Sequence, residues 1–463
     1  MEERFRTAGI IAEFNPFHRG HRYLIEQTRR LGGADYVIVV MSGDFVQRGE
    51  PAMVDKYLRT RMALAGGADL VIELPTVYAS ASAEEFATAG VSILDTLGLV
   101  DLLSFGTEFM EAEELLPVAR ILAEEPENYR LQLREGIREG KSFPASREDA
   151  LLAYLKDLEE YDLERIREMF GGPNHILGLE YLKALIRRSS SIEPMTVIRQ
   201  GAGYHETHWD RAYPSASGIR RFLKENSGST AEKPKGMAEP GKALAEDLQA
   251  STESEKALTE DLQALTEPGK ALAEDLQALT GLDEDLAKEL ADRWRTGDRV
   301  DWADLMGFLD YQILYSDLQG FLGLDEELAA RIKNCHRPGM SFEGLIEILH
   351  SRQRTDTSLK RALLHLVLQM GEGKPDLKNK ASLFPYIRVL GFRKRAGRLL
   401  SAIRESCPVP ILQRYADRNL LVDPEARRCY EMDIKCESLY EQTAARSAGR
   451  RPIHPGSRQQ III

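Results

Sequence analysis

The 463-residue chain has no apolar run near the roughly 18 residues that a helix needs to cross a bilayer. Its first residues, "MEERFRTAGIIAEF", lack a long apolar stretch followed by a small-residue cleavage site. We therefore expect neither a membrane span nor an export signal, which favours a cytoplasmic protein.

Cysteine is scarce as well. The four cysteines are confined to the last third of the chain, with no CxxC pair and no histidines at zinc-finger spacing. They are Cys335, Cys407, Cys429 and Cys436. A closed zinc site needs four ligands, so the isolated pair Cys335-His336 does not make one. We expect a reduced protein without metal-binding cysteines.

Positive charge is in deficit, because 61 Lys and Arg face 73 Asp and Glu and give a net charge of −12. That balance excludes a surface coated uniformly with cations for nucleic acid. Basic residues nevertheless gather locally, in 352–361, 388–398 and 446–458. Such patches, rather than the net charge, decide whether a polyanion docks.

The first 225 residues alternate short, nearly continuous apolar runs with helical patterns. The predicted strands span 8–14, 36–41, 69–74, 100–105 and 195–200. Between them, 54–67 and 83–98 are predicted helices that end at glycine. This alternation is typical of a doubly wound α/β domain with a parallel sheet, in which ligands bind beyond the carboxyl ends of the strands.

The composition changes beyond residue 225. The segments "KALAEDLQA" from 242, "KALTEDLQALTEPG" from 256 and "KALAEDLQALT" from 270 repeat every 14 residues, with leucines four apart. We interpret 226–282 as an acidic surface insertion, with a partner-binding arm as the alternative. Amphipathic stretches predict a mostly helical domain over 283–440, and the basic stretches within it make it the candidate RNA-binding domain. The Arg- and Gln-rich residues 441–463 are expected to form a poorly ordered tail.

Two histidines three positions apart stand in "GIIAEFNPFHRGH", residues 9–21. A helix that begins near Arg19 or Gly20 would point its free N–H groups and positive dipole end at the same crevice as His18 and His21. That combination suits a triphosphate, because positioned donors stabilise the charge that grows when attack on the α-phosphorus expels pyrophosphate. The alternative is a histidine pair that lies near a turn and has no chemical role.

This stretch resembles the HIGH-type signature of the nucleotidyltransferase superfamily. Together with "MSGDFVQRGEPAMVDKYLRTRMALAGGADLVIELP", "SFGTE", "PNHILGLEYLKAL", "SASGIR" and "PYIRVLGF", it is similar to the bacterial tRNA(Met) cytidine acetate ligase family. The resemblance covers 9–223 and about 300–440, and the repeats and the Arg-rich end fall outside it. It implies an enzyme that activates acetate with ATP to acetyl-adenylate and pyrophosphate. The acetyl group then passes to N4 of the wobble cytidine 34 of elongator tRNA(Met), and AMP is released.

The resemblance implies an ATP site made of the first motif and three single residues. The motif positions are Ile11, Ala12, Glu13, Phe14, Asn15, Pro16, Phe17, His18, Arg19, Gly20, His21, Arg22, Tyr23 and Leu24. Gly106 would let the nucleotide approach bare backbone, Asn174 offers a donor and acceptors, and Arg199 suits a phosphate. The alternatives are a turn glycine, a helix N-cap after Pro173 and a surface salt bridge. His18 and His21 are the catalytic candidates, and the division of roles between them stays open.

Ser215, Ser217 and Arg220 in "SASGIR" resemble the second phosphate-binding signature of the superfamily, and Ser217 is alternatively an N-cap. Asp44 and Arg48 follow the second predicted strand. Arg48 is a weaker candidate to anchor a carboxylate such as acetate, unless the two side chains simply pair.

Two basic stretches are candidates for RNA. If "RQRTDTSLKRALLH" is helical, Arg354, Ser358 and Arg361 share one face. In "YIRVLGFRKRAGR", basic residues alternate with Tyr386 and Phe392, which suit stacking on bases. The predicted tRNA contacts are Arg352, Arg354, Lys360, Arg361, Arg388, Arg393 and Lys394, with Arg395 and Arg398 beside them. The alternative is an ordinary solvated charged face.

The function expected from these features is an ATP-dependent ligase that takes acetate and tRNA as further substrates. Two alternatives stay open: a nucleotidyltransferase that moves AMP to a small phosphorylated acceptor, and a nucleotide-sensing RNA-binding protein without turnover. Magnesium is expected with ATP, but no dedicated carboxylate pair is visible, so we predict no metal site on the protein. Oligomeric state and the choice of cytidine 34 stay open.

Overall fold

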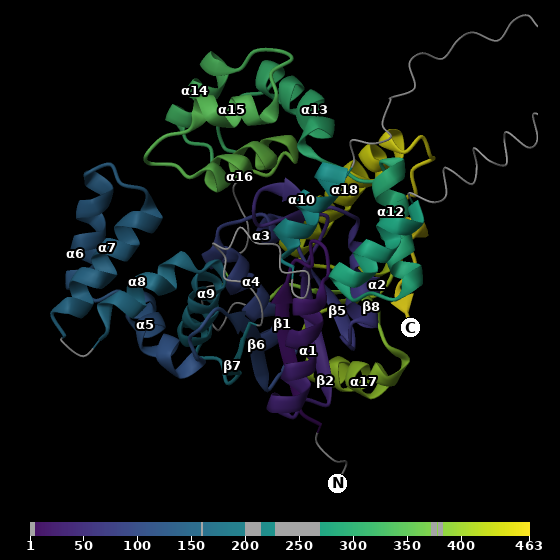
Figure 1. Ribbon diagram of the computed structural model, residues 1–463, viewed down its shortest axis with the longest axis horizontal. Coiled ribbons are helices and arrows are strands. Elements are labelled where there is room, and N and C mark those ends of the chain that lie inside the picture. Colours follow the sequence, from purple (N-terminus) through teal and green to yellow (C-terminus); the bar gives the residue numbers. More distant parts are fainter. Residues whose placement is uncertain (1–4, 159–160, 200–213, 227–268, 372–376, 378–382) are drawn as a thin grey trace, which may run out of the picture.

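The computed structural model describes residues 5–158, 161–199, 214–226, 269–371, 377 and 383–463. A sheet of eight strands lies at its centre, in the order β10-β8-β5-β2-β1-β6-β7 with β9 beside β8 (Figure 1). The strands are β1 Thr7–Ala12, β2 Tyr36–Ser42, β5 Leu70–Leu74, β6 Leu102–Thr107, β7 Glu193–Ile198, β8 Ile387–Phe392, β9 Ile411–Leu412 and β10 Ile461–Ile462. Strands β5, β2, β1, β6 and β7 run parallel, whereas β8 is antiparallel to β5.

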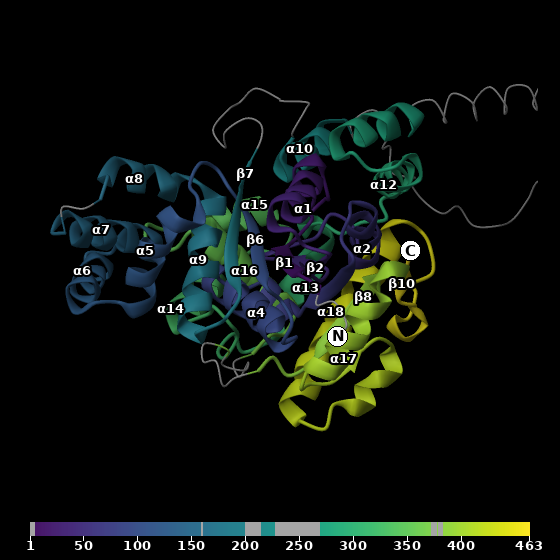
Figure 2. The same cartoon turned by 90° about the horizontal axis from the view of Figure 1, so that it is seen from below.

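Helices cover both faces of the sheet, because successive apolar residues of each strand point to opposite sides. Ile11 and Val40 pack into one core and Ile10 and Val39 into another. Figure 2 shows α4 on the first side and α1 and α10 on the second. The flanking helices are α4 Ala83–Thr96 and α9 Pro173–Arg188 on the first side, and α1 Arg19–Gly32, α2 Lys56–Ala65, α10 Ala216–Asn226 and α12 Glu284–Thr296 on the second. The predicted doubly wound α/β fold is confirmed, with its five strands at β1, β2, β5, β6 and β7.

Two helical groups extend from this sheet (Figure 1). One lies between β6 and α9 and comprises α5 Ala112–Glu124, α6 Glu127–Arg138, α7 Phe143–Lys156 and α8 Leu163–Gly171. The other has a core of its own and comprises α13 Trp302–Tyr315, α14 Glu326–Cys335, α15 Phe342–Leu349 and α16 Asp356–Val367. Trp302 stacks on Phe342 and donates its indole N–H to the Gly49 carbonyl at 3.1 Å. Gly49 lies in the hairpin of β3 (Phe45–Val46) and β4 (Glu50–Pro51), so the second group is attached beside the carboxyl ends of the strands.

The region 283–440 is mostly helical, as predicted, but strands also occur in it after residue 386. Residues 387–392 form β8 and enter the main sheet, because their apolar side chains cover the free edge of β5. Two helices follow β8, namely α17 Gly397–Ser406 and α18 Pro424–Ser447. Short helical turns lie at Lys394–Ala396, Tyr415–Leu420 and Pro455–Ser457. Earlier in the chain, the short helix α3 Thr76–Ala79 follows β5. Residues 387–463 therefore add β8, β9 and β10 to the α/β unit.

The chain end also differs from the poorly ordered tail that we predicted. Ile461 and Ile462 form β10 beside β8, where Ile461 faces Gly391. A Cβ atom on Gly391 would lie 2.7 Å from Cβ of Ile461, so the glycine makes room for the last strand. Arg450 and Arg458 contribute ion pairs to the buried carboxylate of Glu441.

The repeat segment is described in part. The copies from 242 and 256 lie outside the described residues, apart from the glycine at 269 that ends the second copy. Residues 269–280, which contain the third copy, form a helix whose Leu276 and Leu279 are buried in the core beside α10 and α12. The predicted surface insertion therefore ends in a segment of the core, because its leucine stripe packs against Ile219 and Leu223. In the part of the chain that the structure describes, no helix is long and apolar enough to cross a membrane.

Shortening Leu276 to alanine should lower the free energy of unfolding by about 2–5 kcal/mol, because its side chain is fully buried. Urea denaturation of the full chain measures the change. Leu31→Ala on the exposed side of α1 is the control and should stay within about 0.5 kcal/mol of the wild type. Equal losses in the two variants would show that the last repeat contributes nothing to the core.

Candidate active site

The HRGH motif forms the start of α1, as predicted. His18 is the N-cap, and its Nδ1 accepts a hydrogen bond from the Gly20 N–H at 3.1 Å. His21 Nδ1 accepts from the His18 N–H at 3.2 Å, and the two rings stack with centroids 3.7 Å apart. Ile11 and Ala12 end β1, and Arg19 to Leu24 form the first turns of the helix.

The same hydrogen bonds determine which nitrogen of each imidazole carries a proton. Because Nδ1 accepts in both rings, the neutral side chains bear their proton on Nε2. Burial lowers the pKa of His18 to about 3, and the charges of Arg199 and Arg220 add to the effect. Burial also lowers the pKa of His21 well below its usual value, and His18 and Arg199 contribute further. At neutral pH the pair therefore consists of uncharged Nε2–H donors.

The loops beyond β1 and β2 are held by Arg59 of α2, which is fully buried. Its guanidinium donates to the carbonyls of Glu13 at 2.7 Å, Ser42 at 3.0 Å and Val54 at 3.0 Å, and also to Gly43. One side chain thus links three loops at the carboxyl edge of the sheet. We did not predict this role, although an arginine inside the apolar helix pattern 54–67 was a usable signal.

The SASGIR segment lies against the first motif. Arg220 Nη1 donates to the Asn15 carbonyl at 2.6 Å, and Nη2 donates to Ser217 Oγ at 3.3 Å. Ser215 Oγ accepts from the Gly218 N–H at 3.1 Å, so the side chain that bonds the first turn of α10 is that of Ser215. The two predicted phosphate-binding segments, about 200 residues apart in sequence, therefore meet.

Gly106, Asn174 and Arg199 come together at the ends of β6 and β7. Gly106 lies inside β6 without a left-handed φ, so it is not a turn glycine. A Cβ atom on Gly106 would lie 3.5 Å from Arg199 Cγ, which is an ordinary contact distance. The neighbouring residues therefore leave room for a side chain here. A ligand that approaches the backbone closely would be a reason for glycine at this position. Asn174 is not the N-cap of α9, because Gly172 is. Arg199 is exposed and pairs with no carboxylate among the described residues.

Asp44 and Arg48 do not pair with each other. Asp44 accepts from the backbone N–H of Lys56 at 2.8 Å, and burial raises its pKa to about 7 against the opposing charge of Lys56. Arg48 lies near Glu13, whose Oε1 accepts from the Gln47 N–H at 2.9 Å. Within the described ranges, no three His, Cys, Asp or Glu side chains come close enough to hold a metal ion.

The chain is similar to proteins of one family along nearly its whole length. Residues 5–452 match the model of the HIGH Nucleotidyl Transferase family. The tRNA(Met) cytidine acetate ligase of Acetivibrio thermocellus is 34% identical over 452 residues, which cover 96% of this chain and 98% of that protein. The chain belongs to this ligase family. Its relative in Halothermothrix orenii is 36% identical over 408 residues, 87% of this chain and 86% of that protein.

Solved structures of the family have the same architecture. Thermotoga maritima TmcAL in its apo form I matches with a TM-score of 0.80 at 28% identity, and 99% of each chain is covered. Thermotoga maritima TmcAL bound with alpha-thio ATP matches with a TM-score of 0.78 at 26% identity and the same coverage. The fold of the family thus extends over the whole chain.

The residues that we predicted to contact tRNA fall into two places. Arg352, Arg354, Lys360 and Arg361 lie on or just before α16, beside the hairpin at the carboxyl edge. A Cβ atom on Gly49 would lie 2.4 Å from the Arg361 backbone nitrogen, so α16 touches this hairpin directly. Arg354 pairs with Asp325, whereas Arg352 is exposed.

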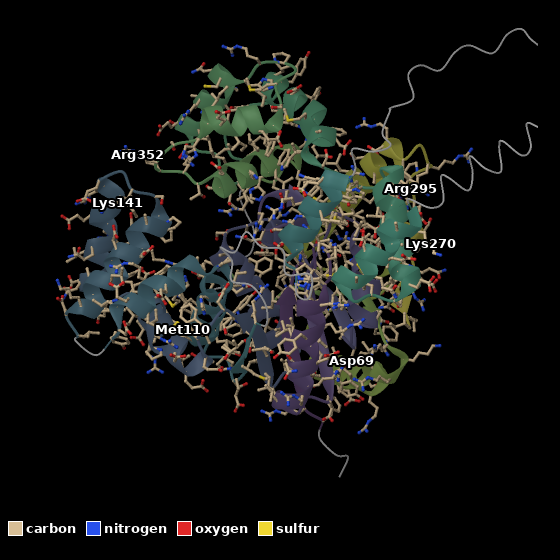
Figure 3. The ribbon with its side chains drawn as sticks, in the orientation of Figure 1. Asp69, Met110, Lys141, Lys270, Arg295 and Arg352 are labelled. Atoms are coloured by element: carbon tan, nitrogen blue, oxygen red, sulfur yellow. The ribbon has the colours of Figure 1, made fainter. Side chains whose placement is uncertain are left out.

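The second basic stretch lies elsewhere. Because β8 is antiparallel to β5, the residues after it reach the opposite, amino-terminal edge of the sheet, where Arg395 pairs with Asp69 at 2.6 Å. Figure 3 shows Asp69 and Arg352 on opposite sides of the molecule. Arg393 donates to the Leu64 carbonyl at 2.9 Å, and Lys394 is exposed at this same edge.

Arg388 itself lies within the sheet, with 11% of its side chain exposed. Its guanidinium lies 2.8 Å from both Glu73 and Glu437, and Tyr386 beside it is 1% exposed. These two side chains therefore support the fold, and neither presents a surface to RNA. Spacing in the sequence did not reveal this, because their partners come from β5 and α18.

Replacing His18 with asparagine keeps a cap acceptor and removes the imidazole. Unfolded histidine takes up a proton near its ordinary pKa of 6.5, whereas folded His18 does so near 3. Between these values the unfolded chain binds the extra proton, so stability falls by about 1.4 kcal/mol per pH unit as pH drops. His18→Asn should remove this contribution in urea unfolding from pH 6.5 to 4, and an unchanged slope would contradict the assignment.

Proposed function

We propose that this chain is an ATP-dependent ligase that activates acetate as acetyl-adenylate and acetylates N4 of cytidine 34 of elongator tRNA(Met). One observation carries the proposal: the two phosphate-binding segments meet where Arg220 contacts the Asn15 carbonyl. Family membership over the whole chain and the alpha-thio ATP bound by the Thermotoga maritima neighbour support ATP as the first substrate.

In the first step a carboxylate oxygen of acetate attacks the α-phosphorus of ATP. The bond from this phosphorus to the β-bridging oxygen breaks, and pyrophosphate leaves with the bonding electrons. The Nε2–H groups of His18 and His21 donate to the oxygens on which charge grows, without giving up a proton. Arg199 and Arg220 supply the positive charge that the neutral histidines lack. Arg48, beside Glu13, is the candidate to attract acetate.

In the second step the N4 amine of cytidine attacks the acetyl carbonyl. The bond from the acetyl carbon to the AMP oxygen breaks, AMP leaves, and the amine releases one proton. This step needs an RNA loop at the carboxyl edge of the sheet. We assign tRNA docking there to Arg352, Lys360 and Arg361, and contact of α16 with the Gly49 hairpin supports this assignment. Magnesium, when present, would be held by the triphosphate.

Incubation of the protein with labelled acetate, ATP and bulk tRNA tests the proposal. Labelled tRNA together with AMP and pyrophosphate is the expected result. Transfer of AMP to another acceptor would replace the proposal by a nucleotidyltransferase. Binding of tRNA and ATP without pyrophosphate release would replace it by a non-catalytic RNA-binding protein.

His21→Ala should leave tRNA binding intact and lower acetate-dependent pyrophosphate exchange by about 10²–10³-fold, because a donor to the leaving group is lost. Exchange of labelled pyrophosphate into ATP measures the loss. Arg30→Ala, an exposed change on the same helix, is the control. Normal exchange in His21→Ala would remove this residue from the chemistry.

Lys360→Ala should weaken tRNA binding and lower the slope of log K against log salt by about 1, because one phosphate contact disappears. Filter binding at several salt concentrations measures both effects. Arg398→Ala at the opposite edge should change neither. Equal effects of the two variants would exclude docking on α16.

A further inference from the structure

Glu108, the last residue of "SFGTE", connects the residues at the ends of β6 and β7. Its Oε1 accepts from the backbone N–H of Asn174 at 3.2 Å and from the amide Nδ2 of Asn174 at 2.7 Å. Its Oε2 accepts from the His175 N–H at 3.1 Å. The carboxylate therefore occupies the N-terminus of α9 and holds one side chain that we assigned to the nucleotide.

His175 lies behind this carboxylate, and its backbone N–H, not its side chain, makes the hydrogen bond to it. The imidazole is fully buried, and its Nε2 accepts from the backbone N–H groups of Phe109 at 3.2 Å and Met110 at 3.3 Å. Its proton therefore sits on Nδ1, which lies 3.0 Å from Oε2 of Glu108. Both oxygens of Glu108 thus have defined partners, and the carboxylate has little freedom to turn.

The fixed carboxylate determines which end of the Asn174 amide, Nδ2 or Oδ1, points toward Glu108. An ionised carboxylate accepts hydrogen bonds and cannot donate them, so the Nδ2 end of the amide must point toward Glu108. The other end, Oδ1, then points away, and no described residue donates a hydrogen bond to it. Asn174 can offer a ligand an acceptor, and its donor is already used.

This acceptor lies in the same corner as Gly106 and Arg199. The charge of Glu108 acts on Arg199, whose Cγ is within contact distance of a Cβ placed on Gly106. Arg199 in turn acts on both histidines of the first motif. We place the nucleoside part of a ligand whose phosphates lie at the histidines in this corner.

We propose that Glu108 is a positioning residue that sets the nucleotide selectivity of the site by holding Asn174 Oδ1 as a fixed acceptor. This role of Glu108 rests on one part of the proposed function, namely that the ligand is a nucleoside triphosphate. The group selected is a hydrogen-bond donor of the nucleoside, either the 6-amino group of adenine or a ribose hydroxyl. A nucleotide without that donor leaves Asn174 Oδ1 unpaired when it binds, and the site should therefore bind that nucleotide more weakly.

Titration calorimetry with the full chain tests the proposal with four nucleotides: ATP, purine riboside triphosphate, which lacks the 6-amino group, and 2′-deoxy-ATP and 3′-deoxy-ATP. We expect the wild type to bind one of the three analogues at least tenfold more weakly than ATP. In Asn174→Ala that ratio should fall to about 1, since the partner of the missing group is gone. The analogue that loses affinity identifies the donor.

Glu108→Ala should reproduce this change, because Nδ2 loses its fixed acceptor and the Asn174 amide becomes free to turn. Glu108→Asp keeps a carboxylate at the helix N-terminus but shortens its reach to Nδ2, so its ratio should also move toward 1. The matched control is Glu111→Ala, which removes the carboxylate at the start of α5 that accepts from Thr196 at 2.6 Å. This control should keep the wild-type ratio.

Two results would overturn the proposal: a wild type that binds all three analogues as tightly as ATP, or folded Glu108 variants that keep the wild-type ratio. Both are independent of acetate and tRNA. A chain that does not acetylate tRNA but shows the expected ratios would refute the proposed function and leave the role of Glu108 standing. A chain that acetylates tRNA, but whose Glu108 variants keep the wild-type ratio of analogue to ATP affinity, would support the proposed function and refute the role of Glu108.

Discussion

Three loops at the carboxyl edge of the sheet depend on one buried guanidinium, that of Arg59. A charge without solvent is costly unless its hydrogen bonds are made, and here four backbone carbonyls receive them. Because these carbonyls belong to the segments after β1, after β2 and before α2, the loops take their positions from the same helix. The histidine pair and the β3–β4 hairpin therefore share one rigid frame.

A second group of buried charges extends this frame to the end of the chain. Lys56 Nζ lies 2.6 Å from Glu73 and 2.8 Å from Glu437, and Arg388 contacts the same two carboxylates. Burial alone would raise the pKa of Glu437, but Lys56 and Arg388 lower it well below its usual range. Two cations balanced by two anions join α2, β5, β8 and α18, so helices distant in sequence support the site loops.

Local features of the sequence were sufficient for the central sheet and for identifying the two segments that meet at Asn15 and Arg220. The strand ends, the helix start at Arg19 and the meeting of Asn15 with Arg220 follow from parallel strands whose carboxyl ends share one edge. Arg388 could not be placed in the same way, because its role depends on a strand that enters antiparallel from about 300 residues away. The role of Glu108 was not predicted for a related reason. Its hydrogen-bond partners, Asn174 and His175, belong to α9, and the helices α5 to α8 separate them from Glu108 in the sequence. The local hydrophobic pattern identifies which residues follow a strand. Contacts between elements distant in the sequence determine which side chains those residues meet.

The last strand covers an edge of the sheet that would otherwise have no partner. β10 consists of Ile461 and Ile462, and it pairs with Gly391 and Phe392 of β8. A strand edge without a partner is a site for pairing with other chains. These two isoleucines therefore protect the folded protein from self-association as well as adding to its core.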